Sequence, residues 1–169
     1  MKTKFIFALT ILLFWVSGPT AYAANEDDKL IASDAAAGDK FGSSVAISEM
    51  TVIVGADFDN RSGSAYIFDC SSFPCTQDRK LIPDDGSSVA RFGRSVAING
   101  ATAVVGSIFD DEKSFNSGSV YIFDLSSCVD DICNQTDKLI ALDGESDDHF
   151  GGAVAISGAI VVVGASDDD

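Results

Sequence analysis

Aspartates in two equivalent loops are the residues of this chain whose type and spacing could do chemistry. Asp57 and Asp59 stand two positions apart in the first loop, and Asp110 and Asp111 are adjacent in the second. Carboxylates gathered from neighbouring loops suit calcium, a hard cation that takes six to eight oxygen ligands. Arg61 stands where a third ligand of the first loop would be, so a solvated acidic surface is the alternative interpretation. The sequence therefore offers a calcium site at these four aspartates as one hypothesis.

Signatures of catalysis are missing from the sequence. His149 is the only histidine, and Lys40 and Arg91 stand at its place in two similar stretches. The chain contains no Gly-x-Ser-x-Gly nucleophile elbow, no His-Glu-x-x-His zinc motif and no phosphate-binding loop. Carboxylate pairs are too common in acidic loops to indicate a glycosidase. We expect no enzyme activity and no cofactor other than the candidate calcium.

Four cysteines form two pairs with the same spacing, Cys70 with Cys75 and Cys128 with Cys133. Each pair flanks a short turn between two apolar segments, and positions paired across a hairpin lie about 5.5 Å apart, within reach of a disulfide. Zinc is the alternative, but this spacing and a single histidine fit a zinc knuckle poorly. We expect two local disulfides, each stabilising the fold by roughly 2 kcal/mol.

The first 23 residues have the organisation of a secretory signal peptide. Lysines at positions 2 and 4 precede an apolar run over residues 5–16, and small residues follow at 21–23. The run is shorter than the roughly 20 residues that span a membrane, although a retained anchor is the alternative. We expect cleavage after Ala23, a mature chain of residues 24–169, and a secreted, periplasmic or cell-surface protein without a membrane span.

The charge of the chain disfavours some partners and favours others. Its formal net charge is −15 at pH 7. Binding of nucleic acid or anionic lipid needs clustered lysine and arginine, so neither is expected as a partner. Cations or basic partners fit this charge better, although acidity also serves simply to keep an exported protein dissolved.

One phrase occurs three times along the chain. It reads FGSSVAIS from Phe41, FGRSVAIN from Phe92 and FGGAVAIS from Phe150, and a KLI segment precedes each copy. The distance along the sequence from Phe41 to Phe92, and from Phe92 to Phe150, is the repeat period. A period of this length is typical of proteins built from stacked repeats. The repeats cover residues 29–79, 80–137 and 138–169.

Each repeat consists of short apolar segments without helical periodicity. In the first repeat these segments are residues 29–32, 44–48, 51–56 and 63–69. Almost continuous apolar runs of this length indicate strands buried on both faces. We therefore predict an all-β protein made of β-propeller blades, each with four antiparallel strands. A β-solenoid is the alternative, disfavoured because its coils are shorter than this period.

The third repeat stops after its first segments. We expect a partial propeller of about two and a half blades, and since closure takes at least about four blades, we expect a fragment of a longer protein or an assembly of several chains. Blades left uncovered would expose apolar faces and an unpaired strand edge, which predicts self-association of the chain alone.

The order of Phe-Gly, an apolar strand and Val-Gly-Ala over residues 29–169 resembles the FG-GAP repeat, the blade unit of the integrin α-subunit propeller and of many bacterial exported proteins. The resemblance implies a propeller used for extracellular adhesion or ligand binding. Integrin blades often carry an Asp-x-Asp-x-Asp-Gly calcium loop between their first two strands. Here the turns at 48–50, 99–100 and 157–158 leave no room for it, as in the bacterial short-turn type.

The repeated Phe-Gly pair has the properties of a structural corner. Glycine supplies a positive φ or a close backbone approach, and phenylalanine is large enough to fill a gap between blades. We expect no chemistry from these residues, which are Phe41, Gly42, Phe92, Gly93, Phe150 and Gly151.

Function is therefore expected in the loops. In an up-and-down blade, the loop between the second and third strands lies at the same end as the connection between blades, and acidic residues gather in both. We predict an exported, non-catalytic binding or adhesion module that presents an acidic loop face to an extracellular protein or glycan. The alternative is an accessory propeller of a larger secreted enzyme encoded beyond the C-terminus.

Overall fold

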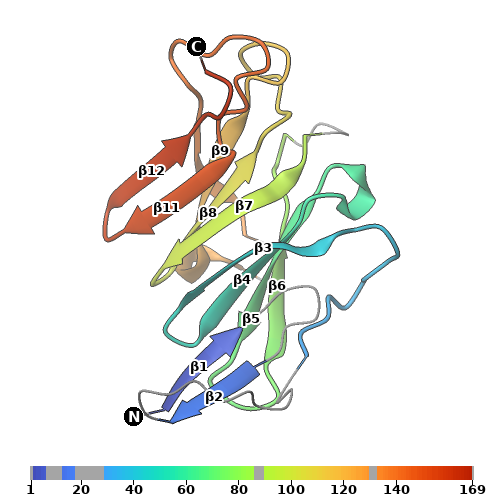
Figure 1. Cartoon of the computed structure of the whole chain (residues 1–169), viewed down its shortest axis with the longest axis vertical. Helices are drawn as coiled ribbons and strands as arrows, with labels where there is room; N and C mark the ends of the chain where they lie inside the picture. The colour runs from blue at the N-terminus through green and yellow to red at the C-terminus, as the bar shows by residue number, and fades with distance from the viewer. Residues whose placement is uncertain (1, 7–12, 18–28, 86–89, 130–132, 169) are drawn as a thin grey trace.

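The structure is a computed structural model that describes residues 2–6, 13–17, 29–85, 90–129 and 133–168. It consists of antiparallel sheets that follow one another along the chain (Figure 1). Among the described residues, no helix is long and apolar enough to cross a membrane. The predicted all-β fold class and the four-stranded blades are confirmed.

Two complete blades carry the fold, each with its strands in chain order and each followed by the next blade. The first blade consists of β3 (Phe41–Ser48), β4 (Thr51–Ala56), β5 (Ser64–Asp69) and β6 (Thr76–Leu81), with a 3-10 turn, η1 (Asp59–Arg61), before β5. The second consists of β7 (Phe92–Asn99), β8 (Thr102–Ser107), β9 (Ser119–Asp124) and β10 (Gln135–Leu139), with η2 (Leu125–Ser127) after β9. The third sheet contains β11 (Ala153–Ser157) and β12 (Ile160–Gly164).

A separate hairpin is formed by β1 (Lys2–Ile6) and β2 (Leu13–Ser17), which pair antiparallel with each other. Both strands fall within the predicted signal peptide. The predicted cleavage site at residues 21–23 lies outside the described residues.

The fourth strand of each blade differs from the expected segments. β6 and β10 begin before the KLI residues and pair with β5 and β9, whereas residues 29–32 lie outside any strand. Leu30 and Ala32 instead pack on the first blade in one buried cluster with Val54 and Tyr66. The physical reason is local, because a cysteine-closed hairpin brings β6 and β10 beside their partners and no such hairpin precedes residue 29.

The repeated phrase lies at the seam between blades. Phe92 is fully buried there, edge-to-face with Tyr121 at 5.4 Å between ring centres, in a cluster that includes Ile67 of the first blade. Ser44 Oγ of the first phrase donates a hydrogen bond to the carbonyl oxygen of Gly93 in the second, at 2.8 Å. The phrase therefore packs each blade on the next.

One glycine of this seam shows how closely the backbones approach. Gly55 of β4 lies against Gly93, and a Cβ at position 55 would collide with the Gly93 carbonyl oxygen. Gly93 itself has φ of +86°, in the left-handed region that favours glycine. A side chain at either position would push the two blades apart.

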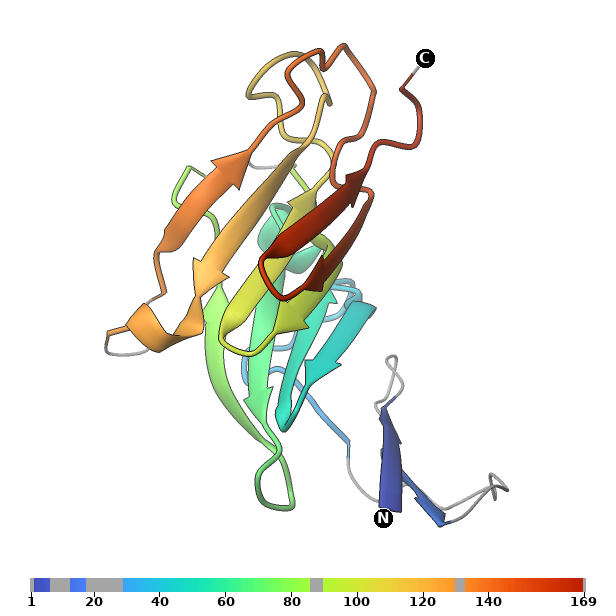
Figure 2. The same cartoon turned by 90° about the vertical axis from the view of Figure 1, so that its left-hand side faces the viewer.

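The blades have two chemically different ends, which can be followed in Figure 2. The turn end contains the hairpins β3–β4 and β7–β8 and the disulfide hairpins β5–β6 and β9–β10, joined by backbone hydrogen bonds such as Cys70 N to Met50 O at 2.8 Å. The loop end contains the β4–β5 and β8–β9 loops and the connections between blades. Backbone hydrogen bonds join them, such as the one from Phe58 N to Asp39 O at 3.2 Å.

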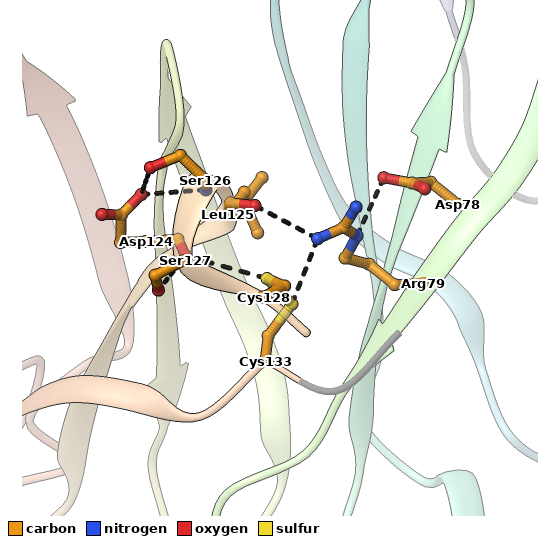
Figure 3. Close-up of a disulfide and its surroundings, with 8 residues drawn as sticks. All are labelled: Asp78, Arg79, Asp124, Leu125, Ser126, Ser127, Cys128 and Cys133. Carbon is orange, nitrogen blue, oxygen red and sulfur yellow. Dashed lines mark hydrogen bonds and ion pairs between the residues drawn. A yellow bond between two sulfur atoms is a disulfide. The ribbon is translucent and has the colours of Figure 1, made fainter. Parts of the chain in front are cut away.

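The predicted disulfides are present at the turn end. Cys70 bonds to Cys75 and Cys128 bonds to Cys133, with Cα atoms 4.3 and 4.4 Å apart. Figure 3 shows the second disulfide beside Arg79 of β6. Arg79 Nη1 donates to the Leu125 carbonyl oxygen at 3.1 Å and lies 3.6 Å from Cys133 Sγ, so a first-blade side chain reaches the second blade here.

Candidate binding face at the loop end

Each complete blade holds a cluster of charged side chains at its loop end. In the first, Tyr66 of β5 and Lys80 of β6 are cross-strand partners, which places both side chains beside η1. Lys80 Nζ lies 2.5 Å from Asp34 Oδ2 and 2.5 Å from Asp59 Oδ2. The Tyr66 hydroxyl lies 2.9 Å from Asp34 Oδ1 and 3.2 Å from Asp59 Oδ2. We call these four residues the first ion cluster.

The second blade repeats the arrangement at equivalent positions. Tyr121 of β9 and Lys138 of β10 are cross-strand partners. The Tyr121 hydroxyl bonds to Asp85 at 2.9 Å and to Asp110 at 2.6 Å. Lys138 Nζ lies 2.5 Å from Asp85, 3.0 Å from Glu112 and 3.3 Å from Asp110. This second ion cluster shows that the arrangement belongs to the repeat.

The contacts of the first cluster decide its ionisation. The Lys80 hydrogen bond lowers the pKa of Asp34. Burial raises the pKa of Asp59, but hydrogen bonds from Lys80 and Ser64 outweigh it, so this pKa also lies below its usual value. Burial lowers the pKa of Lys80, but its bonds to the two aspartates raise it overall. Burial raises the pKa of the Tyr66 hydroxyl. The cluster therefore contains carboxylates, an ammonium and a neutral phenol at neutral pH.

The four aspartates predicted as calcium ligands have separate partners. Asp59 and Asp110 belong to the two ion clusters, Asp57 pairs with Arg91 Nη1 at 3.5 Å, and Asp111 accepts a hydrogen bond from the Asn116 backbone at 2.7 Å. Within the described parts of the chain, no group of three or more histidine, cysteine, aspartate or glutamate side chains is arranged to hold a metal ion. The structure therefore does not bring the four together.

A row of alternating cations and aromatic rings crosses the same end of the blades. Lys40 Nζ lies 3.6 Å from the centre of the Phe58 ring. The Arg91 guanidinium lies 4.0 Å from Phe58 and 4.9 Å from Phe109, and the Phe109 ring lies 5.3 Å from the His149 ring. Contacts of this kind are attractive because the ring face is electronegative. We call these five residues the cation–aromatic ladder.

Backbone conformation explains why the ladder forms. Lys40, Arg91 and His149 each precede a Phe-Gly corner and have φ of 55°, 56° and 57°, a left-handed conformation that all three share. Phe58 and Phe109 stand at equivalent places in the β4–β5 and β8–β9 loops. Each of these three side chains therefore projects toward the same loop position of its own or the preceding blade.

The ladder ends differently at the third blade. Asp167 stands there at the position of the two phenylalanines, and its Oδ2 lies 2.7 Å from His149 Nδ1. A contact between imidazole and carboxylate thus stands where the ring contact lies in the other blades.

A groove opens between the first two blades beside the ladder. It has a volume of about 420 Å³ and is lined by Phe58, Arg61, Arg91 and Phe109. Arg61 is exposed, and Phe58, Arg91 and Phe109 are half-buried. Aromatic surface with a few placed charges is the usual composition of a ligand site.

The sequence-based prediction of the site missed most of these residues. The sequence places the tyrosines and lysines of the ion clusters in predicted strands and gives the two ladder phenylalanines no role. Their recurrence at equivalent positions of the repeats was the available signal. What the sequence could not show is that the loop carboxylates are bound by lysines of β6 and β10.

Comparison with known families identifies the repeat. The sequence model of the FG-GAP repeat matches at residues 24–68, 75–123 and 133–169. No curated protein matches the chain significantly.

Proposed function

Since the chain belongs to the FG-GAP repeat family, we propose that it is an exported, non-catalytic β-propeller module that binds an extracellular protein or glycan through the loop end of its blades. The observation that carries the proposal is the contrast between the ends. The turn end is closed by tight hairpins and disulfides, whereas the loop end carries a groove with aromatic and charged lining.

Two features support export. The N-terminal segment has the composition of a signal peptide. The two disulfides are of the kind that forms and persists in oxidising compartments.

The proposal is tested with variants that alter one end at a time. The full chain would be applied to an array of printed neutral glycans, uronic-acid glycans, collagen and fibronectin. The loop-end variant carries Phe58→Ala and Phe109→Ala, which remove the aromatic lining of the groove. The matched turn-end variant carries Ile47→Ala and Met50→Ala, which remove exposed apolar side chains at the β3–β4 hairpin.

We expect the native chain to bind at least one class of probe. The loop-end variant should lose most of that signal, and the turn-end variant should retain it. Equal loss in both variants, or binding to none of the probes, would contradict the proposal.

A further inference from the structure

The groove between the first two blades has the features of a site for an anionic sugar. Phe58 and Arg61 line it from the first blade, and Arg91 and Phe109 line it from the second. We propose that it binds one hexuronic acid residue of an extracellular glycan. This inference rests on the proposed function and specifies the ligand class of that surface.

Two guanidinium groups supply the complementary charge. Arg61 is exposed, and its side chain forms no hydrogen bond or ion pair with any residue that the structure describes. Among the described residues, the Arg91 guanidinium has one carboxylate partner, Asp57, which contacts Nη1 at 3.5 Å, and the other N–H groups are directed to no described acceptor. A guanidinium presents five N–H donors in a rigid fork that matches the two oxygens of a carboxylate. The groove thus contains the donors for a bidentate pair.

Other charges near the groove restrict the choice of anion. The Asp57 carboxylate competes for Arg91, while Lys40 adds a positive charge over Phe58. The chain as a whole has a net charge of −15, so a dense polyanion such as nucleic acid is repelled at long range. A ligand with a single carboxylate avoids most of this repulsion.

The two phenylalanines indicate which kind of molecule carries the carboxylate. Phe58 and Phe109 are both half-buried and leave part of each ring at the groove surface. An aspartate or glutamate side chain would leave most of the 420 Å³ empty. A pyranose ring fills more of the space, packs its C–H groups on the aromatic surface and keeps its hydroxyl groups at the open side. A uronic acid combines the pyranose ring with the carboxylate.

The test uses two sugars that differ at one carbon. Methyl β-D-glucuronoside carries the carboxylate, and methyl β-D-glucoside carries a neutral hydroxymethyl group in its place. Binding to the full chain would be measured by isothermal titration calorimetry and by saturation-transfer NMR. We expect the glucuronoside to bind with a Kd in the millimolar range and the glucoside to bind at least about tenfold more weakly.

Variants locate the site. Arg61→Gln is expected to weaken glucuronoside binding about tenfold, the equivalent of losing one charged contact. Arg91→Lys keeps the charge but removes the fork, and it should also weaken binding. Arg94→Gln removes a charge from a neighbouring cavity outside this groove and should change the Kd by less than about twofold.

Equal affinity for the two sugars, or an unchanged Kd in Arg61→Gln, would overturn the inference. Tighter binding of acetyl-aspartate amide or of a single-stranded DNA oligonucleotide than of the glucuronoside would also overturn it. If the glucuronoside fails while array binding still depends on the loop end, this inference alone fails. Array binding that does not depend on the loop end would remove the proposed function as well.

Discussion

The turn end and the loop end of each blade are stabilised by different kinds of interaction. At the turn end, short hairpins are joined by backbone hydrogen bonds and by a disulfide in each complete blade. At the loop end, ion pairs between side chains connect the loops, because Lys80 and Lys138 each bind carboxylates from two separate loops.

The two repeats differ in length at both ends. At the loop end, the β8–β9 loop is longer than the β4–β5 loop, and Asp110 still bonds to Tyr121 as part of an ion cluster. At the turn end, the β9–β10 connection is longer than the β5–β6 connection, and a disulfide still closes it. Each end therefore keeps its own kind of interaction when the length of its connections changes.

The largest effect is expected when one cluster loses its cation. Lys80→Met leaves Asp59, whose side chain is 4% exposed, without its ammonium partner. Removing one partner of a buried ion pair costs about 3 to 5 kcal/mol, and we expect about 3 kcal/mol here because Lys80 is partly exposed. Chemical denaturation measures this change in the free energy of unfolding.

Lys113→Met is the matched control for this prediction. Lys113 is exposed and belongs to neither ion cluster, so the same substitution should change stability by no more than about 0.5 kcal/mol. Similar losses in both variants would show that the first ion cluster contributes no specific stability.

A smaller loss of stability is expected when the disulfide at the turn end of the first blade is removed. Replacing Cys70 and Cys75 together by alanine removes a closed loop with a sequence separation of 5. Loop-closure entropy for so short a ring corresponds to about 2 kcal/mol. Denaturation of the double variant measures this loss of stability. A loss larger than that of Lys80→Met would show that the turn end contributes more to stability than the loop end.

The contact between blades at the turn end should contribute less. Arg79→Ala removes the hydrogen bond to the Leu125 carbonyl oxygen and the contact with Cys133. We expect a loss of about 1 kcal/mol, since the donor is charged but partly exposed. The triple variant with Arg79→Ala, Cys128→Ala and Cys133→Ala would show whether the two effects are coupled, and strict additivity would mean that they are independent.

The smallest effect concerns pH and involves the carboxylates of the two ion clusters. Asp34, Asp59 and Asp85 have pKa values below their usual range in the fold, so the unfolded chain binds more protons in acid. Their stabilisation is fully present above about pH 4, near the unfolded pKa, and is lost as the pH falls through the folded values. Unfolding at pH 7, 5, 4 and 3 should show this, with a shallower decline in Lys80→Met. An equal decline in the variant would contradict the prediction.

The repeats contained enough information to predict the fold. Apolar segments of fixed length and the copies of the Phe-Gly phrase indicated strands and blades, because burial on both faces is visible as unbroken apolar sequence. The disulfides followed from cysteine spacing alone. The start of β6 could not be predicted in the same way, since residues 76–79 are polar and become a strand only through pairing with β5.

The candidate site was less accessible to the sequence. The acidic loops suggested a cation site, but they gave no sign that Asp59 and Asp110 would be bound by lysines of β6 and β10. Nor could spacing reveal that Arg91 stacks on rings of two different blades. The first feature depends on strand pairing within a blade and the second on how blades pack, and no local pattern encodes either.

We expect Lys80 to stabilise the loop end and Arg61 to bind a ligand there, and one measurement tests this difference most directly. Thermal unfolding of the native chain, Lys80→Met and Arg61→Gln would be followed with and without methyl β-D-glucuronoside. In a chain of this size about 1 kcal/mol corresponds to roughly 3 °C, so Lys80→Met should melt about 9 °C lower.

For Arg61→Gln we predict a melting temperature within about 2 °C of the native chain, together with loss of the rise that the glucuronoside causes in the native chain. An Arg61→Gln variant that melts as low as Lys80→Met, or that keeps the full ligand-induced rise, would show that Arg61 and Lys80 do not have these separate roles.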